Sequence, residues 1–180
     1  MGASGGRLRI DRRRLLEGTA VALPFLCTPF ASAVHAAVDE ALISDVKLAA
    51  KWIALALKQS GYNADFSVES LAEIERFFNE HSRDGRPLPG GRLADRTGQR
   101  LFALGSYVGE VIRREGGGQW YAESGDPDAE INIELQLPGG SRIWPMHRVI
   151  QRLKNGPEEN IYDYGRIILQ SLDPVDEPAR

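Results

Sequence analysis

The sequence predicts an α+β fold in which helices come first, a small antiparallel sheet follows, and two helices close the domain. Three observations predict this class. Apolar residues recur with a helical period up to residue 115, alternate with a period of two between residues 119 and 144, and return to the helical period after residue 146. We therefore expect three N-terminal helices, a three-strand meander and two C-terminal helices in a two-layer sandwich.

Length and composition limit the kind of protein. The chain has 180 residues, of which 42% are hydrophobic and 26% are charged, close to the average for soluble globular proteins. One Cys excludes a disulfide framework, and with three His it leaves too few ligands for a His/Cys zinc site. The net charge of −3 argues against a nucleic-acid partner. We expect one globular domain with no cofactor and no metal.

The first 36 residues have the layout of an export signal. A basic region with five arginines comes first, an apolar run from Thr19 to Ala33 follows, and small residues lead to Ala36. Two prolines interrupt the apolar run, which is shorter than the roughly 20 residues that a membrane span needs. We expect a cleaved signal peptide and no stable membrane span in the mature chain.

A local motif predicts the export route. The segment DRRRLL at residues 11–16 resembles the twin-arginine consensus, with Arg12 and Arg13 as the paired arginines. We expect export to the periplasm or the cell exterior by this route, with cleavage after Ala36. A Sec signal, cleavage after Ala33 and retention as an anchor are the alternatives. Cleavage after Ala36 would remove the lone Cys and shift the net charge from −3 to −6, because five arginines and two acidic residues are lost.

The first helix of the mature domain is expected over residues 39–60. Apolar residues recur there at steps of three and four, and Leu48, Trp52 and Leu55 widen the stripe. Gly61 supplies a left-handed stop.

A second helix is expected over residues 67–79, with Ser67 as its N-cap. Residues 81–91 contain two Pro and three Gly, which predicts a loop.

The segment 92–115 is expected to form a central helix. Its apolar residues cover more than half of the circumference, which is typical of a helix buried between other elements. Gly105 and Gly109 lie one turn apart and would let another backbone approach closely. Ala103 and Glu110 fall on the remaining face, among basic residues.

The strongest strand signal is the run from Glu130 to Leu137, in which polar and apolar residues alternate without a break. A turn at residues 138–141 leads into a strand at residues 142–144, and residues 119–123 are expected to form the first strand. These strands would form an antiparallel meander with one face toward solvent.

The helical period returns in the last part of the chain. Helices are expected at residues 146–154 and 158–172, the second with Pro157 at its start. Together these elements predict a single domain over residues 37–172. The acidic, Pro-containing residues 173–180 are expected to be a flexible tail.

The block from Leu104 to Trp120 resembles a recurrent feature of small bacterial proteins described as domains of unknown function. It matches the pattern LGxYxGExIRRxxGGxW, and a Trp-Pro pair at residues 144–145 and the segment KNGPE at residues 154–158 extend the likeness to roughly residues 60–165. The resemblance implies one compact α+β domain and implies no activity. The export signal is a departure from the pattern.

No catalytic residue is predicted, because no nucleophile–base pair, metal cluster or phosphate loop is recognisable. His81 and His147 have no carboxylate at a fixed helical spacing. Asp126, Asp128 and Glu130 have the initial spacing of a calcium loop but lack its glycine and its final glutamate.

Two groups of residues are candidates for a binding surface. The first would run along one side of the central helix and could hold an anion or an acidic partner, and comprises Arg92, Arg96, Arg100, Glu110, Arg113 and Arg114. The second would lie where strand ends meet a helix start, and comprises Trp120, Trp144, His147 and Arg148. The structural alternatives are a solvated helix face and tryptophans that seal the core.

These observations predict an exported, non-enzymatic protein that binds a protein or a cell-envelope polymer. One alternative is a small envelope hydrolase whose carboxylate pair is assembled by the fold, for example from Glu110 and a residue on the sheet. Another is an immunity-like or inhibitor-like module. Two facing carboxyl groups in a pocket would favour the hydrolase, and an exposed patch of Trp and Arg would favour binding.

Overall fold

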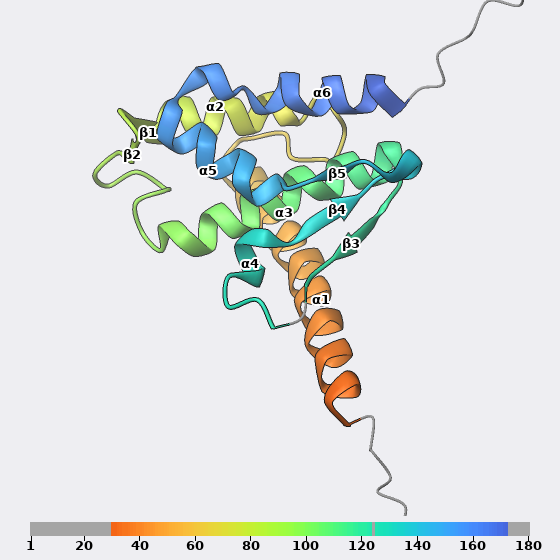
Figure 1. Ribbon diagram of the computed structural model, residues 1–180. Coiled ribbons are helices and arrows are strands. Elements are labelled where there is room, and N and C mark those ends of the chain that lie inside the picture. The colour runs from red at the N-terminus through yellow and green to blue at the C-terminus, as the bar shows by residue number, and fades with distance from the viewer. Residues whose placement is uncertain (1–29, 124, 173–180) are drawn as a thin grey trace, which may run out of the picture.

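A computed structural model, which describes residues 30–123 and 125–172, confirms the α+β class (Figure 1). Within these residues it has six α-helices and two small antiparallel sheets, of two and three strands. The helices are α1 (Phe30–Gln59), α2 (Leu71–His81), α3 (Thr97–Gly116), α4 (Ala129–Asn132), α5 (Pro145–Asn155) and α6 (Ile161–Leu172). The strands are β1 (Ser82–Arg83), β2 (Arg86–Pro87), β3 (Gln119–Tyr121), β4 (Glu134–Gln136) and β5 (Arg142–Ile143). Arg12, Arg13 and residues 173–180 lie outside the described residues.

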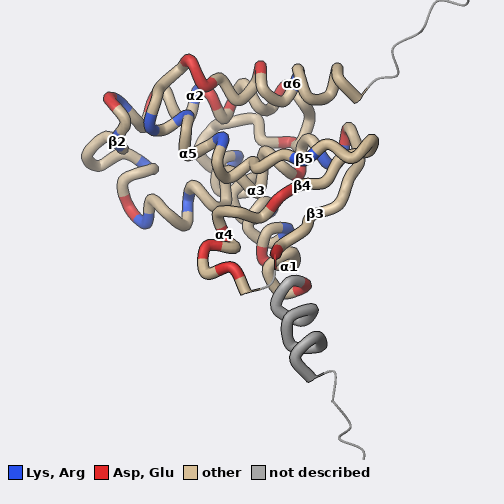
Figure 2. The backbone as a smooth tube through the Cα atoms, in the orientation of Figure 1, with Lys and Arg blue, Asp and Glu red and all other residues tan. Residues whose placement is uncertain are grey.

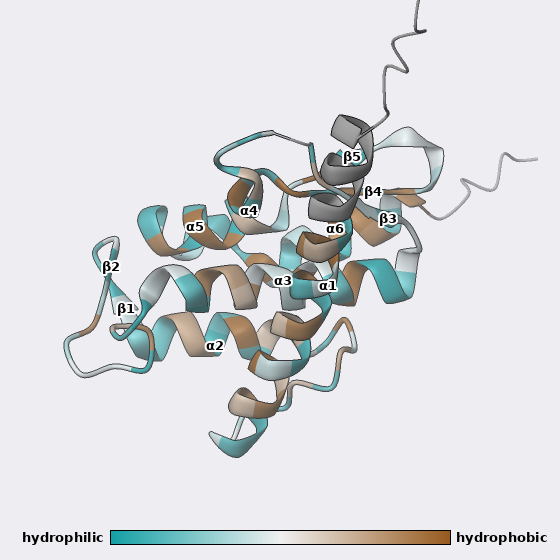
Figure 3. Cartoon of the chain, turned by 90° about the horizontal axis from the view of Figure 1, so that it is seen from below, coloured by the Kyte–Doolittle hydropathy of each residue, from teal (hydrophilic) through white to brown (hydrophobic). Residues whose placement is uncertain are grey.

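Helix α3 is the centre of the molecule. Helices α1, α5 and α6 all contact it, and α2 and α6 lie side by side on the same side of the fold (Figure 1). Apolar residues of these helices form one buried cluster, and Figure 3 shows apolar stretches on each of them. Every residue from Ala103 to Ile112 is buried, which confirms the prediction of a helix enclosed by other elements. Ala103 and Glu110 are therefore buried too, and the expectation that they share an outward polar face was wrong.

The two glycines of α3 make room for close neighbours. A Cβ atom on Gly105 would meet the backbone of Met146, and one on Gly109 would meet the ring of Trp120 and the side chain of Pro145. The predicted approach of another backbone is thus confirmed at Gly105, whereas Gly109 makes room for side chains. These contacts fix the start of α5 and the strand β3 against the central helix.

Residues 81–91, which were expected to form a loop between the second and third helices, contain a hairpin. The hairpin β1–β2 separates α2 from α3, and its turn is Asp84-Gly85 with both residues in the left-handed region (φ 51° and 74°). An Asp-Gly pair with this geometry closes tight hairpins. Helix α3 begins only at Thr97, because Arg96 is also left-handed (φ 51°).

The run from Glu130 to Leu137 is not one strand. Residues Ala129–Asn132 form the helical turn α4, and only Glu134–Gln136 pair in the sheet. The Asp126 side chain accepts the backbone N–H of Asp128 at 2.8 Å and the side-chain amide of Asn132 at 2.6 Å. Such local side-chain bonds offer the backbone an alternative to a strand, and here they prevail over the alternating pattern.

Three helix boundaries also differ from the expected ones. Helix α2 begins at Leu71 rather than near residue 67, and its N-cap is Ser70 rather than Ser67. Helix α1 begins at Phe30 rather than residue 39, so both expected cleavage positions, after Ala33 and after Ala36, lie within this helix. The last helix begins at Ile161, because Asn160 has an extended backbone (φ −57°, ψ 123°) and separates α6 from a short 3₁₀ turn at Pro157–Glu159.

A buried ion pair joins three of the helices. Arg152 of α5 donates from Nε to Glu75 Oε2 of α2 at 2.7 Å and from a guanidinium NH₂ to Asn79 Oδ1 at 2.6 Å. The backbone N–H of Ile161, the first residue of α6, donates to the other oxygen of Glu75 at 2.6 Å. Both charges are therefore satisfied in the interior, as buried charges must be.

Candidate binding site

The three-stranded sheet carries a row of aromatic and polar side chains on one face. Tyr121 of β3 pairs with Glu134 of β4. In the β4–β5 pairing Leu135 lies opposite Ile143, which places Trp144 beside Glu134. Residues opposite one another in neighbouring strands point to the same side of a sheet. Tyr121, Glu134 and Trp144 therefore form one row across all three strands.

The other face of this sheet belongs to the core. Trp120 and Leu135 are buried, and Ile143 is partly buried against the same cluster. The strand order β3–β4–β5 is that of the predicted antiparallel meander. Trp120 and Trp144 consequently lie on opposite faces, and the expectation that they converge is not met.

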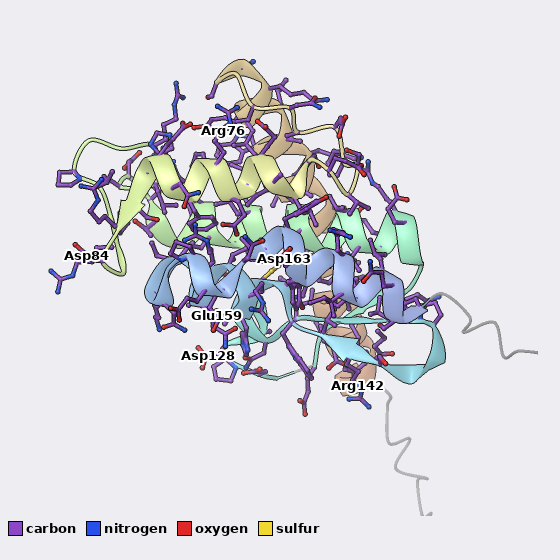
Figure 4. The ribbon with its side chains drawn as sticks, turned by 90° about the horizontal axis from the view of Figure 1, so that it is seen from above. Arg76, Asp84, Asp128, Arg142, Glu159 and Asp163 are labelled. Atoms are coloured by element: carbon purple, nitrogen blue, oxygen red, sulfur yellow. The ribbon has the colours of Figure 1, made fainter. Side chains whose placement is uncertain are left out.

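A cavity of about 330 Å³ lies beside the Tyr121–Glu134–Trp144 row. The rings of Tyr121 and Trp144 are 48% and 40% exposed. In Figure 4, Arg142 points outward from the strands. A volume of a few hundred Å³ is typical of small-molecule sites, in which a few polar groups fix a ligand's orientation. The cavity is lined by Tyr121, Glu123, Asp126, Asn132, Glu134, Arg142 and Trp144.

One polar wall of the cavity comes from α4 and the loop before it. Asn132 donates from Nδ2 to Asp126, and Nε2 of His147 lies 3.1 Å from Oδ1 of the same asparagine. The hydrogen bonds from Asn132 and from the backbone of Asp128 lower the pKa of Asp126. His147 is thus a support for Asn132 at the edge of the site.

The second polar wall comes from the strands. Glu134 is largely buried and accepts a hydrogen bond from Gln136 Nε2 at 2.8 Å. A guanidinium nitrogen of Arg142 lies 3.6 Å from the same carboxylate oxygen, and the Arg142 side chain is mostly exposed. This wall therefore offers a buried acceptor and an exposed donor next to each other.

The arrangement suits a ligand with apolar faces and many hydroxyl groups. Tyr and Trp present a flat apolar ring with a polar tip, so they can cover the C–H face of a sugar ring. Carboxylate, amide and guanidinium groups at the edge provide both acceptors and donors for hydroxyl groups. These groups require no charge on the ligand.

Glu110 forms a separate cluster with an internal role. Its carboxylate accepts hydrogen bonds from Trp120 Nε1 at 2.9 Å and from Arg113 Nε at 2.7 Å, and Arg114 lies 3.7 Å away. Burial raises the pKa of Glu110, but the bonds from Arg113 and Trp120 and the two arginine charges outweigh that effect and lower it overall. The group on the sheet that meets Glu110 is thus an indole rather than a second carboxyl group.

The arginines expected along one side of the central helix are in two places. Arg92 and Arg96 precede α3, whereas Arg113 and Arg114 lie near its end. The Arg114 guanidinium stacks on the Phe66 ring at 3.6 Å from its centroid. Arg92 lies at a different surface, which is described below.

Arg148 is held away from the candidate site. It forms an ion pair with Glu159 and stacks on the Tyr164 ring, 4.3 Å from its centroid. Burial raises the pKa of Tyr164 to about 12. These contacts join α5 to α6.

His81 has structural partners. Its Nε2 lies 3.1 Å from the Tyr62 hydroxyl, which also donates to Glu80 at 2.5 Å. Burial lowers the pKa of His81, and burial together with Glu80 raises the pKa of Tyr62 to about 12. This cluster joins the end of α1 to the end of α2.

Of the predicted patch, Trp144 and His147 belong to the candidate site. Sequence reasoning missed Tyr121, Glu134 and Arg142 as binding residues. The strand alternation around Trp120 could have identified Tyr121, since its neighbours in sequence point inward. Nothing in the sequence indicated that Asp126 and Asn132 would meet across a helical turn.

Searches with protein-family models, curated proteins and solved structures found no match for this chain. The resemblance to small bacterial domains of unknown function stays a prediction. In the part of the chain that the structure describes, no helix is both long and apolar enough to cross a membrane. The same residues contain no cluster of three His, Cys, Asp or Glu side chains that could hold a metal ion.

Proposed function

We propose that this chain is an exported, non-enzymatic binding protein whose ligand is a carbohydrate polymer of the bacterial cell envelope. The observation that carries the proposal is the pair of half-exposed aromatic rings, Tyr121 and Trp144, on one face of the sheet beside a polar cavity. Buried aromatic side chains would be explained by packing alone. Exposed ones that line a cavity with fixed polar groups are typical of recognition surfaces.

A polymer fits this surface better than a single small ligand. A second row, Gln119, Gln136 and Arg142, lies next to the Tyr121–Glu134–Trp144 row on the same face. Sugar units that follow one another along a chain could occupy both rows, with the rings on the aromatic row and hydroxyl groups on the polar row.

The hydrolase alternative is favoured by one observation. Asp126 and Glu134 line the same cavity, and Glu134 is largely buried. Against it, both carboxyl groups accept hydrogen bonds from N–H donors, and the pKa of Asp126 is lowered. Glycoside hydrolysis needs one carboxyl group that holds its proton near neutral pH. We therefore favour binding without turnover.

Export by the twin-arginine route is part of the proposal. The route suits a chain that folds before transport, because the mature protein would contain no Cys and depends on its apolar core rather than on disulfides. Cleavage after Ala36 would shorten α1 at its N-terminal end. Mass spectrometry of the protein from the exported and the cytosolic fractions tests this. A protein found only in the cytosol with its N-terminus intact would contradict it.

Sedimentation with purified peptidoglycan tests the binding proposal. The full-length chain is expected to co-sediment, and Tyr121→Ala and Trp144→Ala are expected to weaken retention about tenfold each, as for truncated aromatic anchors. Trp52→Ala is the matched control, because Trp52 is also an exposed tryptophan but lies on α1. Equal retention of all variants would contradict the proposed site, and release of reducing sugar would favour the hydrolase.

A further inference from the structure

Helix α1 is apolar on two sides, and the fold uses only one of them. Val46, Ala50, Ile53 and Leu57 are buried against the body of the protein. Leu48, Trp52 and Leu55 were also expected in the core, but they are 66%, 54% and 58% exposed. Their spacing of four and three residues places them in one row on the helix surface. A surface helix normally shows a single apolar stripe, so the packing of this domain does not explain the second one.

A cavity of about 590 Å³ opens beside this row. Trp52 belongs to both, since it stands in the exposed row and forms part of the cavity wall. The rest of the wall comes from the end of α1, from Phe77 of α2, and from five residues before and at the start of α3, which are Gly90, Gly91, Arg92, Asp95 and Arg100. The surface is therefore a ridge of large apolar side chains next to a hollow, which is the shape that receives a protruding side chain from a partner.

Basic residues lie on both sides of the apolar row, and the exposed Asp45 lies near its N-terminal end on the cavity side. With 100° per residue, Lys51 and Lys58 lie on one side of the row on the helix surface. The cavity, whose wall includes Arg92 and Arg100, lies on the other side. Asp95 is the acidic residue of the cavity wall, and it lies 3.6 Å from Arg100. The chain as a whole has a net charge of −3, and Figure 2 shows both acidic and basic residues along α1.

We infer that this surface docks an amphipathic helix of another protein, with acidic residues on both flanks of its apolar stripe. The apolar stripe of the partner packs along Leu48, Trp52 and Leu55, and one large side chain fills the cavity beside Trp52. Its carboxylates face Lys51 and Lys58 on one flank and Arg92 on the other. This is the helix-in-groove mode of recognition, with charge complementarity that selects the partner.

Two other occupants fit the surface less well. If two copies of the chain paired through their α1 helices, parallel or antiparallel, the basic residues beside one apolar row would face those beside the other. Like charges oppose such an association. An anionic membrane would match the charges and the exposed Trp and Leu. A membrane surface, however, supplies no single large side chain for the cavity beside Trp52.

Peptide selection tests this inference with the full-length protein. A displayed library of helical peptides of about 20 residues, long enough to form a helix, carries Leu along one stripe and either Glu or Lys at each flanking position. We expect selection to enrich peptides with Glu on both flanks. Selection of peptides without an acidic preference, or of none, would overturn the inference.

The selected peptide is then titrated against variants by fluorescence anisotropy. Trp52→Ala is expected to weaken binding about tenfold or more, and the double charge reversal Lys51→Glu with Lys58→Glu is expected to weaken it by a similar factor. Trp144→Ala, the exposed tryptophan of the sheet, is expected to leave it unchanged. Equal binding to Trp52→Ala and the unaltered chain would contradict the proposed surface.

Vesicles with anionic headgroups provide the remaining arm of the test. Little co-sedimentation is expected, and the selected peptide should not be displaced by the vesicles. Tight vesicle binding that is lost in Trp52→Ala would assign the surface to a membrane and overturn the inference. The outcome is independent of carbohydrate binding, because the sheet face and α1 share no residue.

Discussion

The two faces of the small sheet use the same residue type in opposite ways. On the inner face Trp120 is buried, covers Gly109 of α3 and donates its indole N–H to Glu110 at 2.9 Å. On the outer face Trp144 is 40% exposed and lines a polar cavity. The protein itself buries the ring of Trp120 and provides the acceptor for its indole N–H. The other tryptophan leaves part of its surface exposed beside the cavity.

The contrast between Trp120 and Trp144 shows how burial and hydrogen bonding distinguish a structural tryptophan from one that is proposed to bind a ligand. Trp120 completes the core, so its removal should affect stability first. Trp144 is partly exposed at the surface, so its removal should affect binding first and stability much less. The predictions below test that division, beginning with the largest effect.

The largest difference is expected between two matched substitutions on the sheet. Trp120→Ala removes a buried ring and leaves Glu110 without its indole donor, so we expect a loss of about 3–5 kcal/mol in the free energy of unfolding. Trp144→Ala removes an exposed ring and should cost less than about 1 kcal/mol. Urea denaturation followed by circular dichroism measures both. Similar losses in the two variants would contradict the division between the faces.

The next effect concerns the glycine that Trp120 covers. Gly109→Ala places a methyl group where the Trp120 ring and Pro145 already lie, so we expect a loss of roughly 1–3 kcal/mol from overpacking. Gly98→Ala is the control in the same helix, since no atom lies within 4 Å of its added Cβ. It should raise stability by about 0.5–1 kcal/mol through helix propensity. If Gly109→Ala left the free energy of unfolding unchanged, the contact between Gly109 and the Trp120 ring would be shown to be loose.

An effect of similar size, which depends on pH, is expected from the charge of Glu110. Because its folded pKa is lowered from the ordinary value of 4.5, the ionised group stabilises the fold above that value, and the stabilisation is lost as the pH falls through the folded pKa. Glu110→Gln should cost about 1.5–3 kcal/mol at neutral pH and little in acid. Unfolding curves of both proteins between neutral and acidic pH measure the difference. The exposed Glu115→Gln is the control, and a constant difference at all pH values would contradict the role of the charge.

Much of the fold follows from patterns that are local in the sequence. The wide apolar surface of the central helix predicted its burial, and Gly105 and Gly109 predicted the close approach of another element. These predictions hold because burial and steric room are properties of the residues themselves. The Asp84-Gly85 pair is typical of a tight hairpin turn, but the surrounding Pro and Gly residues favoured the prediction of a loop.

The failures have a different origin, which is competition between local patterns and contacts made elsewhere. The alternation from Glu130 onward predicts a strand, yet Asp126 bonds to Asn132 and bends this segment into a helical turn. The register of β4 and β5 was also beyond prediction, because Leu137 pairs with Ser141 by a backbone bond rather than leaving a four-residue turn. A slip of one residue would turn Trp144 to the other face. The candidate site could therefore not be assembled from the sequence.

The most direct test of the account is a titration of the isotope-labelled chain with a soluble peptidoglycan fragment. The chain has three tryptophans and hence three indole N–H signals, which are assigned by substitution of each residue in turn. The account predicts that the signal of Trp144 shifts with added ligand, while those of Trp120 and Trp52 stay in place. A shift of the Trp120 signal without one at Trp144, or no shift at all, would contradict it.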